Sequence, residues 1–334
     1  MNQDSTNTTQ NSANTHNANT NNTISTGFKL IDEMLDGGFR KGELIVIAAH
    51  SGMGKTSLAL TMVKNALAMT DIHITLFCLE TTAERYIRRL IAMDTGINSQ
   101  KFYTGELSQE EWVVMQRAAD LLSQKPLRLD DAPATMARIC TYARQACAKG
   151  ELEMLVIDVI QLVRVAGLVH SLSPEQEMRY FVDAFRKLAD ELNIPIIIVS
   201  QLELVGKDRA DKRPILADLQ HVGRLDRKAD IVMFIYREEH YIADTDHKNL
   251  ADIIIAKNPN GMTGSVCLFF EKNLTRFSDL TTRRVPISHR PPGEREDLEG
   301  FSEGSGHIGK ASPGLVHICE AMCFVSNLTT PKTI

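Results

Sequence analysis

Residues 49–57 contain two glycines, a lysine and hydroxyl side chains in the order of a phosphate-binding loop. Gly52 and Gly54 can adopt positive φ angles, which allows consecutive backbone N–H groups to point at phosphate oxygens. Lys55 would bring positive charge to the β- and γ-phosphates, and the Thr56 hydroxyl is suited to Mg²⁺. The stretch therefore predicts binding of a nucleoside triphosphate. The predicted binding residues are Ser51, Gly52, Met53, Gly54, Lys55, Thr56 and Ser57.

The sequence around this loop supplies the elements that would position it. The apolar run 44–49 predicts a strand, and the apolar spacing of about 56–69 predicts a helix. The N-terminus of that helix would add the positive end of its dipole at the phosphates. The first position of the usual pattern is Ala49 instead of glycine. A glycine turn followed by a surface lysine is the structural alternative.

Three polar residues stand at the end of, or within, other apolar runs: Glu80, Asp158 and Gln201. Ligands of an open parallel sheet bind at the carboxyl ends of its strands, so these positions are candidates for chemistry. A carboxylate among aliphatic residues is costly to bury without a metal or a partner. Asp158 is therefore predicted to bind Mg²⁺ together with Thr56. The alternative is a carboxylate satisfied by a helix N-terminus or an arginine.

Glu80 and Gln201 carry groups that phosphoryl transfer could use. This reaction depends on positioning more than on covalent chemistry. Glu80 is therefore predicted to orient and polarise the attacking water, and the Gln201 amide to contact the γ-phosphate and relay its presence. The alternatives are a strand-end cap for Glu80 and a satisfied buried amide for Gln201.

Helix and strand patterns alternate along most of the chain, which is typical of an α/β fold. Capping boxes at Ser108 and Ser173 predict two helix starts. The nearly continuous apolar run 195–202 is expected of a parallel strand whose two faces are covered by helices. The predicted strands are 44–49, 74–80, 127–130, 154–163, 195–202, 231–236, 252–256 and 266–270, and the predicted helices are about 28–35, 56–69, 83–93, 108–122, 134–148 and 173–192.

Composition divides the chain into three parts. Residues 1–24 are dominated by Asn and Thr and bury too little apolar surface to offset the entropy of ordering, which predicts a disordered arm. Residues 25–283 contain the alternating elements and are predicted to form one domain. Residues 284–334 begin with a segment rich in Pro, Gly, Ser and charge, which predicts a flexible tail.

Overall composition excludes some classes of protein. The hydrophobic content of 43% supports a core, and the net charge of −5 excludes a globally basic nucleic-acid-binding protein. Local positive charge inside a ring would still suffice for DNA. The 6 cysteines show no framework spacing, which favours reduced thiols. Because no apolar run of about 18 residues and no signal pattern is evident, we expect a cytoplasmic protein without membrane association.

The order of these motifs resembles the C-terminal RecA-like motor domain of the bacterial replicative helicases, the DnaB family. The resemblance covers about 25–280. It implies a RecA-like P-loop NTPase fold, with a mostly parallel sheet flanked by helices. Further stretches in the family's order are 25–28, 79–80, 104–107 with Trp112, 157–162, 200–202, 209–214 and 229–237.

The resemblance also implies roles for the candidate residues. Lys55 and Thr56 would bind ATP and Mg²⁺, and Glu80 would be the catalytic base. Asp158 would be the second acidic motif, and Gln201 the γ-phosphate sensor. By resemblance the assembly would be a homo-oligomer, a hexamer, acting on single-stranded DNA and served by a helicase loader.

One departure from the family concerns the loop that contacts DNA. The family usually has Asp-Leu-Arg-Glu-Ser-Gly, whereas this chain has Gln220 and His221 in place of Arg-Glu, before Gly223. Backbone N–H groups and nearby Arg224 would still meet phosphate, since phosphate contacts need donors more than one fixed side chain. A solvated loop face is the alternative.

A second departure removes the arginine finger that one subunit inserts into its neighbour's ATP site. The family has Lys-x-Arg, and this chain has Lys257-Asn-Pro259. Proline has neither a cation nor a donor, and fingers are worth roughly 10³–10⁵ in rate. Lys257 would carry part of the charge stabilisation. A third departure is that the Asn/Thr-rich arm stands where the family has a helical N-terminal domain and a linker helix.

The predicted function is an ATP-dependent helicase-like motor that couples ATP hydrolysis to movement along single-stranded DNA and duplex unwinding in replication. The alternative is a finger-less, weakly hydrolysing, ATP-binding accessory subunit that associates with a full-length helicase or its loader. A recombinase or clock-type ATPase of the same fold matches over a shorter span.

Overall fold

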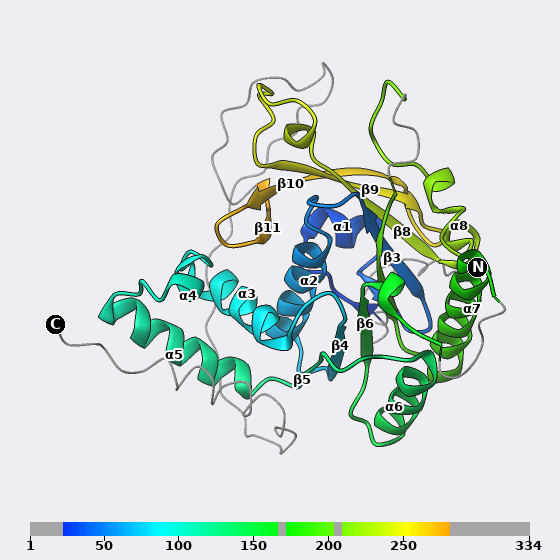
Figure 1. The fold of residues 1–334 in the computed structure, drawn as a ribbon, viewed down its shortest axis with the longest axis horizontal. Helices are drawn as coiled ribbons and strands as arrows, with labels where there is room; N and C mark the ends of the chain where they lie inside the picture. The colour runs from blue at the N-terminus through cyan, green and yellow to red at the C-terminus, as the bar shows by residue number, and fades with distance from the viewer. Residues whose placement is uncertain (1–22, 166–171, 204–208, 281–334) are drawn as a thin grey trace, which may run out of the picture.

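The computed structural model describes residues 23–165, 172–203 and 209–280 (Figure 1). The predicted tail 284–334 and nearly all of the predicted arm 1–24 lie outside the described residues. The arm's last two residues form strand β1 (Thr23–Ile24), which pairs antiparallel with β2 (Phe39–Arg40). Residues 23 and 24, which were predicted as part of the disordered arm, are therefore ordered in a strand. No helix within the described ranges is long and apolar enough to cross a membrane.

The centre of the molecule is a nine-stranded sheet with the order β11-β10-β9-β8-β3-β7-β6-β4-β5. Six strands, from β5 to β8 in that order, are parallel. The remaining three continue the sheet as an antiparallel meander. The strands are β3 (Leu44–Ala49), β4 (Ile74–Cys78), β5 (Leu127–Asp130), β6 (Met154–Asp158), β7 (Ile196–Gln201), β8 (Ile231–Tyr236), β9 (Leu250–Lys257), β10 (Gly264–Glu271) and β11 (Arg276–Asp279).

Helices cover both faces of this sheet (Figure 1). One face carries α1 (Lys29–Met34), α2 (Lys55–Met69), α3 (Ala83–Thr95), α4 (Lys101–Thr104) and α5 (Gln109–Ser123). The other carries α6 (Met136–Ala148), α7 (Pro174–Leu192) and α8 (Leu225–Lys228). The described residues also contain three short 3-10 turns, η1 (Ile160–Leu162), η2 (Leu216–Leu219) and η3 (Glu238–His240). The predicted mostly parallel α/β fold is confirmed.

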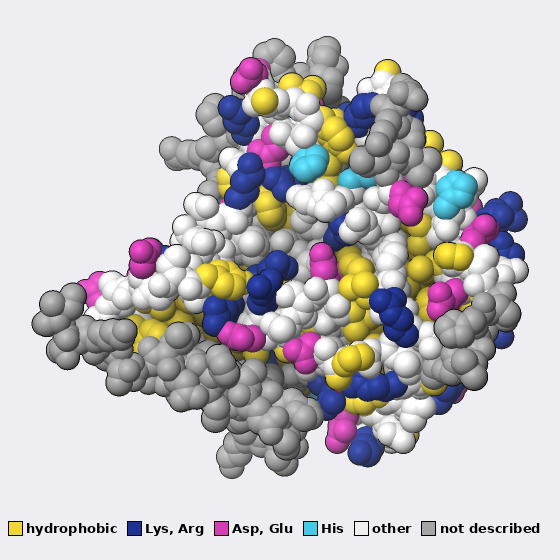
Figure 2. All heavy atoms as spheres, in the orientation of Figure 1, with side chains coloured by type: hydrophobic (Ala, Val, Ile, Leu, Met, Phe, Trp, Pro, Cys, Tyr) yellow, Lys and Arg dark blue, Asp and Glu magenta, His cyan; other side chains and the backbone are white. Residues whose placement is uncertain are grey.

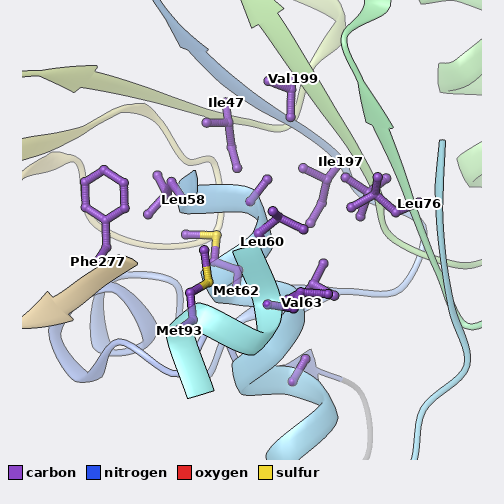
Figure 3. Packing of buried hydrophobic residues seen from close by; sticks show 14 of the residues in the cluster. Ile47, Leu58, Leu60, Met62, Val63, Leu76, Met93, Ile197, Val199 and Phe277 are labelled. Atoms are coloured by element: carbon purple, nitrogen blue, oxygen red, sulfur yellow. The ribbon is translucent and has the colours of Figure 1, made fainter. Parts of the chain in front are cut away.

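Alternate residues of β3 enter two separate cores. Ile45 and Ile47 pack in the cluster that includes α2 and α3, whereas Val46 packs in the cluster that includes α6 and α7. Figure 3 shows the first cluster, where Ile47 faces Leu58 and Leu60 of α2. Both faces of the strand are therefore dry, which explains why its sequence is a continuous apolar run without alternation.

Helix starts were the easiest boundaries to predict. Ser108 and Ser173 each form a reciprocal capping box with the residue three positions later, as the sequence indicated. The predicted strand 154–163 is too long, because β6 ends at Asp158 and the chain continues into η1. Ile160 and Val163 are buried in that turn, and a buried turn has the same apolar composition as a strand.

A half-buried ion pair at the end of β5 gives a stability prediction. Both carboxylate oxygens of Asp130 accept from Arg138 at 2.7 Å. We expect Arg138→Ala to lower the free energy of unfolding by about 2 kcal/mol at neutral pH, because it removes the two closest donors of a buried carboxylate and leaves only the longer contacts from Arg128 at 3.4 Å and the Ala132 N–H at 3.2 Å. The matched control is Arg144→Ala on the same helix, whose pair with Glu191 is exposed; its expected cost is below about 0.5 kcal/mol.

The same pair sets the sign of a pH dependence. Burial raises the pKa of Asp130, but the hydrogen bonds and charge of Arg138 outweigh burial and hold the pKa below its ordinary value. The stabilisation is thus present above the ordinary pKa and is lost as pH falls through the lowered one. Denaturant titrations should show the Arg138→Ala deficit shrinking in acid. Equal costs for both variants at neutral pH would contradict this account.

Candidate active site

The phosphate loop joins β3 to α2, as predicted. Gly54 is the N-cap of α2 in the left-handed conformation, with φ of 99°, and Gly52 has φ of 78°. Lys55 opens the helix, and its Nζ donates to the carbonyl oxygen of His50 at 3.2 Å. This contact folds the lysine side chain back over the loop. The loop therefore has the backbone that a phosphate cradle needs.

Three residues distant in sequence support the loop from outside. A Cβ added to Gly54 would lie 3.0 Å from the Phe277 ring, and one added to Gly52 would lie 3.1 Å from His240. Arg237 donates to the Gly52 carbonyl oxygen at 3.3 Å. Both positions favour glycine because of their positive φ, and these contacts leave little room for a Cβ. Sequence reasoning missed these supports because each lies more than 180 residues from the loop.

The carboxyl ends of four strands meet beside the loop. In the sheet register, Ala49 of β3 pairs with Gln201 of β7. Asp158 of β6 pairs with Cys78 of β4 on one side and with Val199 of β7 on the other. This register places Lys55, Glu80, Asp158 and Gln201 on the side of the sheet where the parallel strands have their carboxyl ends. That side is called the carboxyl edge below. The prediction that these positions share an edge is confirmed.

Asp158 is fully buried at the centre of that edge. Burial raises its pKa to about 6, although the hydroxyls of Thr56 and Tyr86 favour the charged form. Oδ2 accepts from the Tyr86 hydroxyl at 2.8 Å, whereas Oδ1 has no hydrogen-bond partner within the described residues. An orphaned buried carboxylate oxygen beside Thr56 fits a Mg²⁺ site. Mg²⁺ typically takes one or two carboxylates and completes its shell with phosphates and water.

Lys55 and Glu80 complete the charge arrangement. Burial lowers the pKa of Lys55, and the negative charges of Glu80 and Asp158 oppose that shift. Glu80 lies two residues beyond the end of β4 and is exposed. Glu80 is thus a solvent-facing carboxylate whose negative charge acts on the buried Lys55 cation.

The backbone of Gln201 is held in place by Gln161, which lies in the stretch 157–162 that follows the family's order. The Gln161 amide donates to the Ser200 hydroxyl and to the Gln201 carbonyl oxygen, both at 3.0 Å. Its Oε1 accepts from the Gln201 N–H at 3.3 Å. The backbone at the end of β7 is thereby tied to the turn after β6, while the Gln201 side chain is exposed.

The predicted DNA-contacting residues form a turn between η2 and α8. Gln220 and His221 are exposed, and Arg224 is half-buried with Nε 3.5 Å from Oδ1 of Asp226. A Cβ on Gly223 would lie 2.6 Å from the Met178 carbonyl oxygen of α7, and its φ is 57°. Glycine is thus needed here to let the turn pack on α7, with Gln220 and His221 facing solvent.

Charges on the visible face are distributed in small groups. Figure 2 shows dark blue Lys and Arg side chains interspersed with magenta acidic ones across the described part of this face, without a single broad basic surface. This pattern agrees with the net charge of −5. DNA binding would therefore have to rest on local groups of donors, as the sequence indicated.

The structure does not bring Lys257 to the phosphate loop of its own chain. Lys257 pairs with Val232 at the start of β8. Because β8 runs parallel to β3, this position lies at the opposite end of the strands from the loop. Its Nζ donates to the carbonyl oxygens of Asp226, Arg227 and Ala229 at 3.2, 3.0 and 2.5 Å. The lysine thus caps the C-terminus of α8. Any role of Lys257 in ATP hydrolysis would have to be in a neighbouring chain's site.

Comparison with known protein families shows to which family the chain belongs. Residues 23–279 match the family model described as the DnaB-like helicase C-terminal domain. The chain belongs to this family. A solved ATPase domain with 32% identity superimposes with a TM-score of 0.73, covering 79% of this chain and 93% of that one. The predicted family and its RecA-like α/β fold are thereby confirmed.

Curated relatives in the family are replicative DNA helicases. "Replicative DNA helicase DnaC" of Bacillus subtilis (strain 168) is 35% identical over 271 residues, which is 81% of this chain and 59% of the relative. "Replicative DNA helicase DnaB" of Geobacillus stearothermophilus gives the same values. A solved DnaB-like replicative helicase, described with its interactions with primase, has a TM-score of 0.72 and 32% identity, and covers 77% of this chain. The chain spans about 59% of the length of these curated relatives.

Proposed function

We propose that the chain is an ATP-driven DNA helicase motor of replication, acting in the cytoplasm on single-stranded DNA. The observation that carries the proposal is the convergence of Lys55, Glu80 and Asp158 at one sheet edge of a DnaB-like domain. The curated relatives named as replicative helicases support the direction of the assignment. Coupled to strand movement, ATP hydrolysis at this edge would drive duplex unwinding.

Each residue at this end of the strands has its own role in ATP hydrolysis. The loop N–H groups and Lys55 bind and neutralise the β- and γ-phosphates. Thr56 and Asp158 would hold Mg²⁺, which when bound neutralises the charge that develops on the phosphates. Glu80 orients the attacking water and accepts its proton. Gln201 contacts the γ-phosphate and, through the Gln161 network, reports its presence to the segment that leads toward Gln220.

The geometry favours a homo-oligomer. The hairpin that carries the finger position in the family lies at the sheet edge opposite to the phosphate loop. A group on it can reach an ATP site only in a neighbouring chain, as in a head-to-tail ring. We infer a hexamer that surrounds single-stranded DNA, with the turn containing Gln220, His221, Gly223 and Arg224 as the DNA contact, and a loader as a further partner.

Glu80→Gln tests the hydrolytic assignment. The amide keeps the size of the side chain but cannot accept a proton, so we expect steady-state ATP turnover to fall by about 10²-fold while ATP affinity stays within about twofold. Turnover would be measured by phosphate release and affinity by a fluorescent ATP analogue. Glu84→Gln, in the first turn of α3 and paired with Arg88, is the matched control and should keep wild-type turnover. Unchanged turnover in Glu80→Gln would remove Glu80 from the mechanism.

A second function is favoured by one observation, the exposed Pro259 at the finger position. A chain without the finger would bind ATP, hydrolyse it weakly and act as an accessory subunit of a full-length helicase or its loader. Mixing the chain with a full-length replicative helicase distinguishes the two functions. A motor shows its own DNA-stimulated turnover, whereas an accessory subunit changes the turnover of the helicase and shows little by itself.

A further inference from the structure

A tyrosine hydroxyl reaches the carboxylate assigned above to Mg²⁺. Tyr86 lies in the first turns of α3 and is fully buried. Its hydroxyl donates to Oδ2 of Asp158 at 2.8 Å, across 72 residues of sequence. The contact joins the helix that follows Glu80 to the end of β6.

Packing alone does not explain a hydroxyl at this position. Tyr86 belongs to the apolar cluster beneath the sheet, where a phenylalanine ring would fill the same volume. A buried hydroxyl costs free energy unless it is hydrogen-bonded. The carboxylate that it meets is itself fully buried, and its other oxygen, Oδ1, has no partner in the described part of the chain. One oxygen is thus fixed by the protein and the other is left for a ligand.

We propose that Tyr86 is a positioning residue for the Mg²⁺ site, because its hydroxyl fixes Oδ2 of Asp158 and so directs Oδ1 toward the metal. This inference rests on the proposed function, since it deepens the role given to Asp158. Partners that orient a metal ligand in this way are worth about 10- to 100-fold in metal affinity. Tyr86 touches neither nucleotide nor metal in this account and acts only through the carboxylate.

The test is Tyr86→Phe, which removes the hydroxyl and keeps the ring. Mn²⁺ serves as a paramagnetic probe, and its binding to the protein with ADP is followed by the loss of the free-ion electron paramagnetic resonance signal. We expect the dissociation constant of Mn²⁺ to rise by about 10-fold, while ADP affinity without metal stays within about twofold. In hydrolysis, the Mg²⁺ concentration for half-maximal rate should rise by about the same factor, with kcat at saturating Mg²⁺ nearly unchanged.

Tyr142→Phe is the matched control. The Tyr142 hydroxyl is 2.9 Å from the Thr75 hydroxyl, near the other end of β4 and on the other face of the sheet. It should leave Mn²⁺ affinity unchanged, and thermal unfolding of both variants reports whether either fold is damaged. Wild-type Mn²⁺ affinity in Tyr86→Phe, or an equal loss in both variants, would overturn the proposal. A wild-type protein that binds neither ADP nor Mn²⁺ would instead overturn the proposed function, and the inference with it.

Discussion

Lys55→Ala is expected to reduce ATP turnover by about 10³-fold or more and to weaken ATP binding. Lys55 is the buried cation of the phosphate loop, held over the loop by the His50 carbonyl oxygen. Removing it leaves the phosphates facing Glu80 and Asp158 without the positive charge that offsets these carboxylates. Losing one donor from a preorganised site typically costs 10²–10³ in rate, and a full charge costs more. Phosphate release with saturating ATP is the measurement.

Lys64→Ala is the control for this result. Lys64 lies on the same helix, and its Nζ is 3.1 Å from an oxygen of the exposed Asp94. Its removal should leave turnover within about twofold of wild type, because exposed pairs are worth little. If Lys55→Ala kept wild-type turnover while Lys64→Ala did the same, the loop would not be the nucleotide site.

Pro259→Arg is expected to raise DNA-stimulated ATP turnover by about 10³-fold, the lower end of the range for arginine fingers. Pro259 is exposed at the tip of the hairpin between β9 and β10. The hairpin is already anchored, because the Asn258 amide donates to the Met34 carbonyl oxygen at 2.8 Å and the Asn260 amide to Glu43 at 3.2 Å. A cation placed there would therefore project from a fixed base. Turnover should be compared at equal oligomer mass.

Pro259→Ala separates the charge from the loss of proline, and it should show no gain. A mixing experiment tests action in trans. A chain carrying both Pro259→Arg and Lys55→Ala cannot hydrolyse ATP itself, but mixed with wild type it should raise the turnover of wild-type sites. Absence of a gain in an oligomeric preparation would show that the hairpin does not reach the shared site.

Local sequence signals predicted the parts of the site that depend on neighbouring residues. The loop 49–57 was recognisable from its glycine, lysine and hydroxyl residues. Strand β8 was predicted with its observed bounds, because its apolar run is flanked by polar residues on both sides. Glu80, Asp158 and Gln201 were recognisable as polar residues at strand ends. That the carboxyl ends of parallel strands lie on the same side of the sheet follows from α/β topology, whereas the strand order is known only from the structure.

Contacts between segments far apart in the sequence could not be predicted from local sequence patterns. Tyr86 has the composition of a core residue, and only the structure shows its hydroxyl at Asp158. His240 and Phe277 contact the glycines of the loop from segments that contain no chemical motif. Phe277 lies in β11, which is only four residues long. Lys257 was predicted to carry part of the charge stabilisation in a shared site, and this role stays a prediction; within its own chain its Nζ donates to three carbonyl oxygens at the end of α8. Those partners are adjacent to it only through the sheet register.

The central claim is most directly tested by steady-state ATP turnover across a protein concentration series, with and without single-stranded DNA, alongside mass by light scattering. The account predicts turnover that rises with both oligomer mass and DNA, since the finger hairpin and the phosphate loop lie at opposite edges of the sheet. A monomer that binds ATP without turnover under all these conditions would contradict the motor function and favour the accessory subunit.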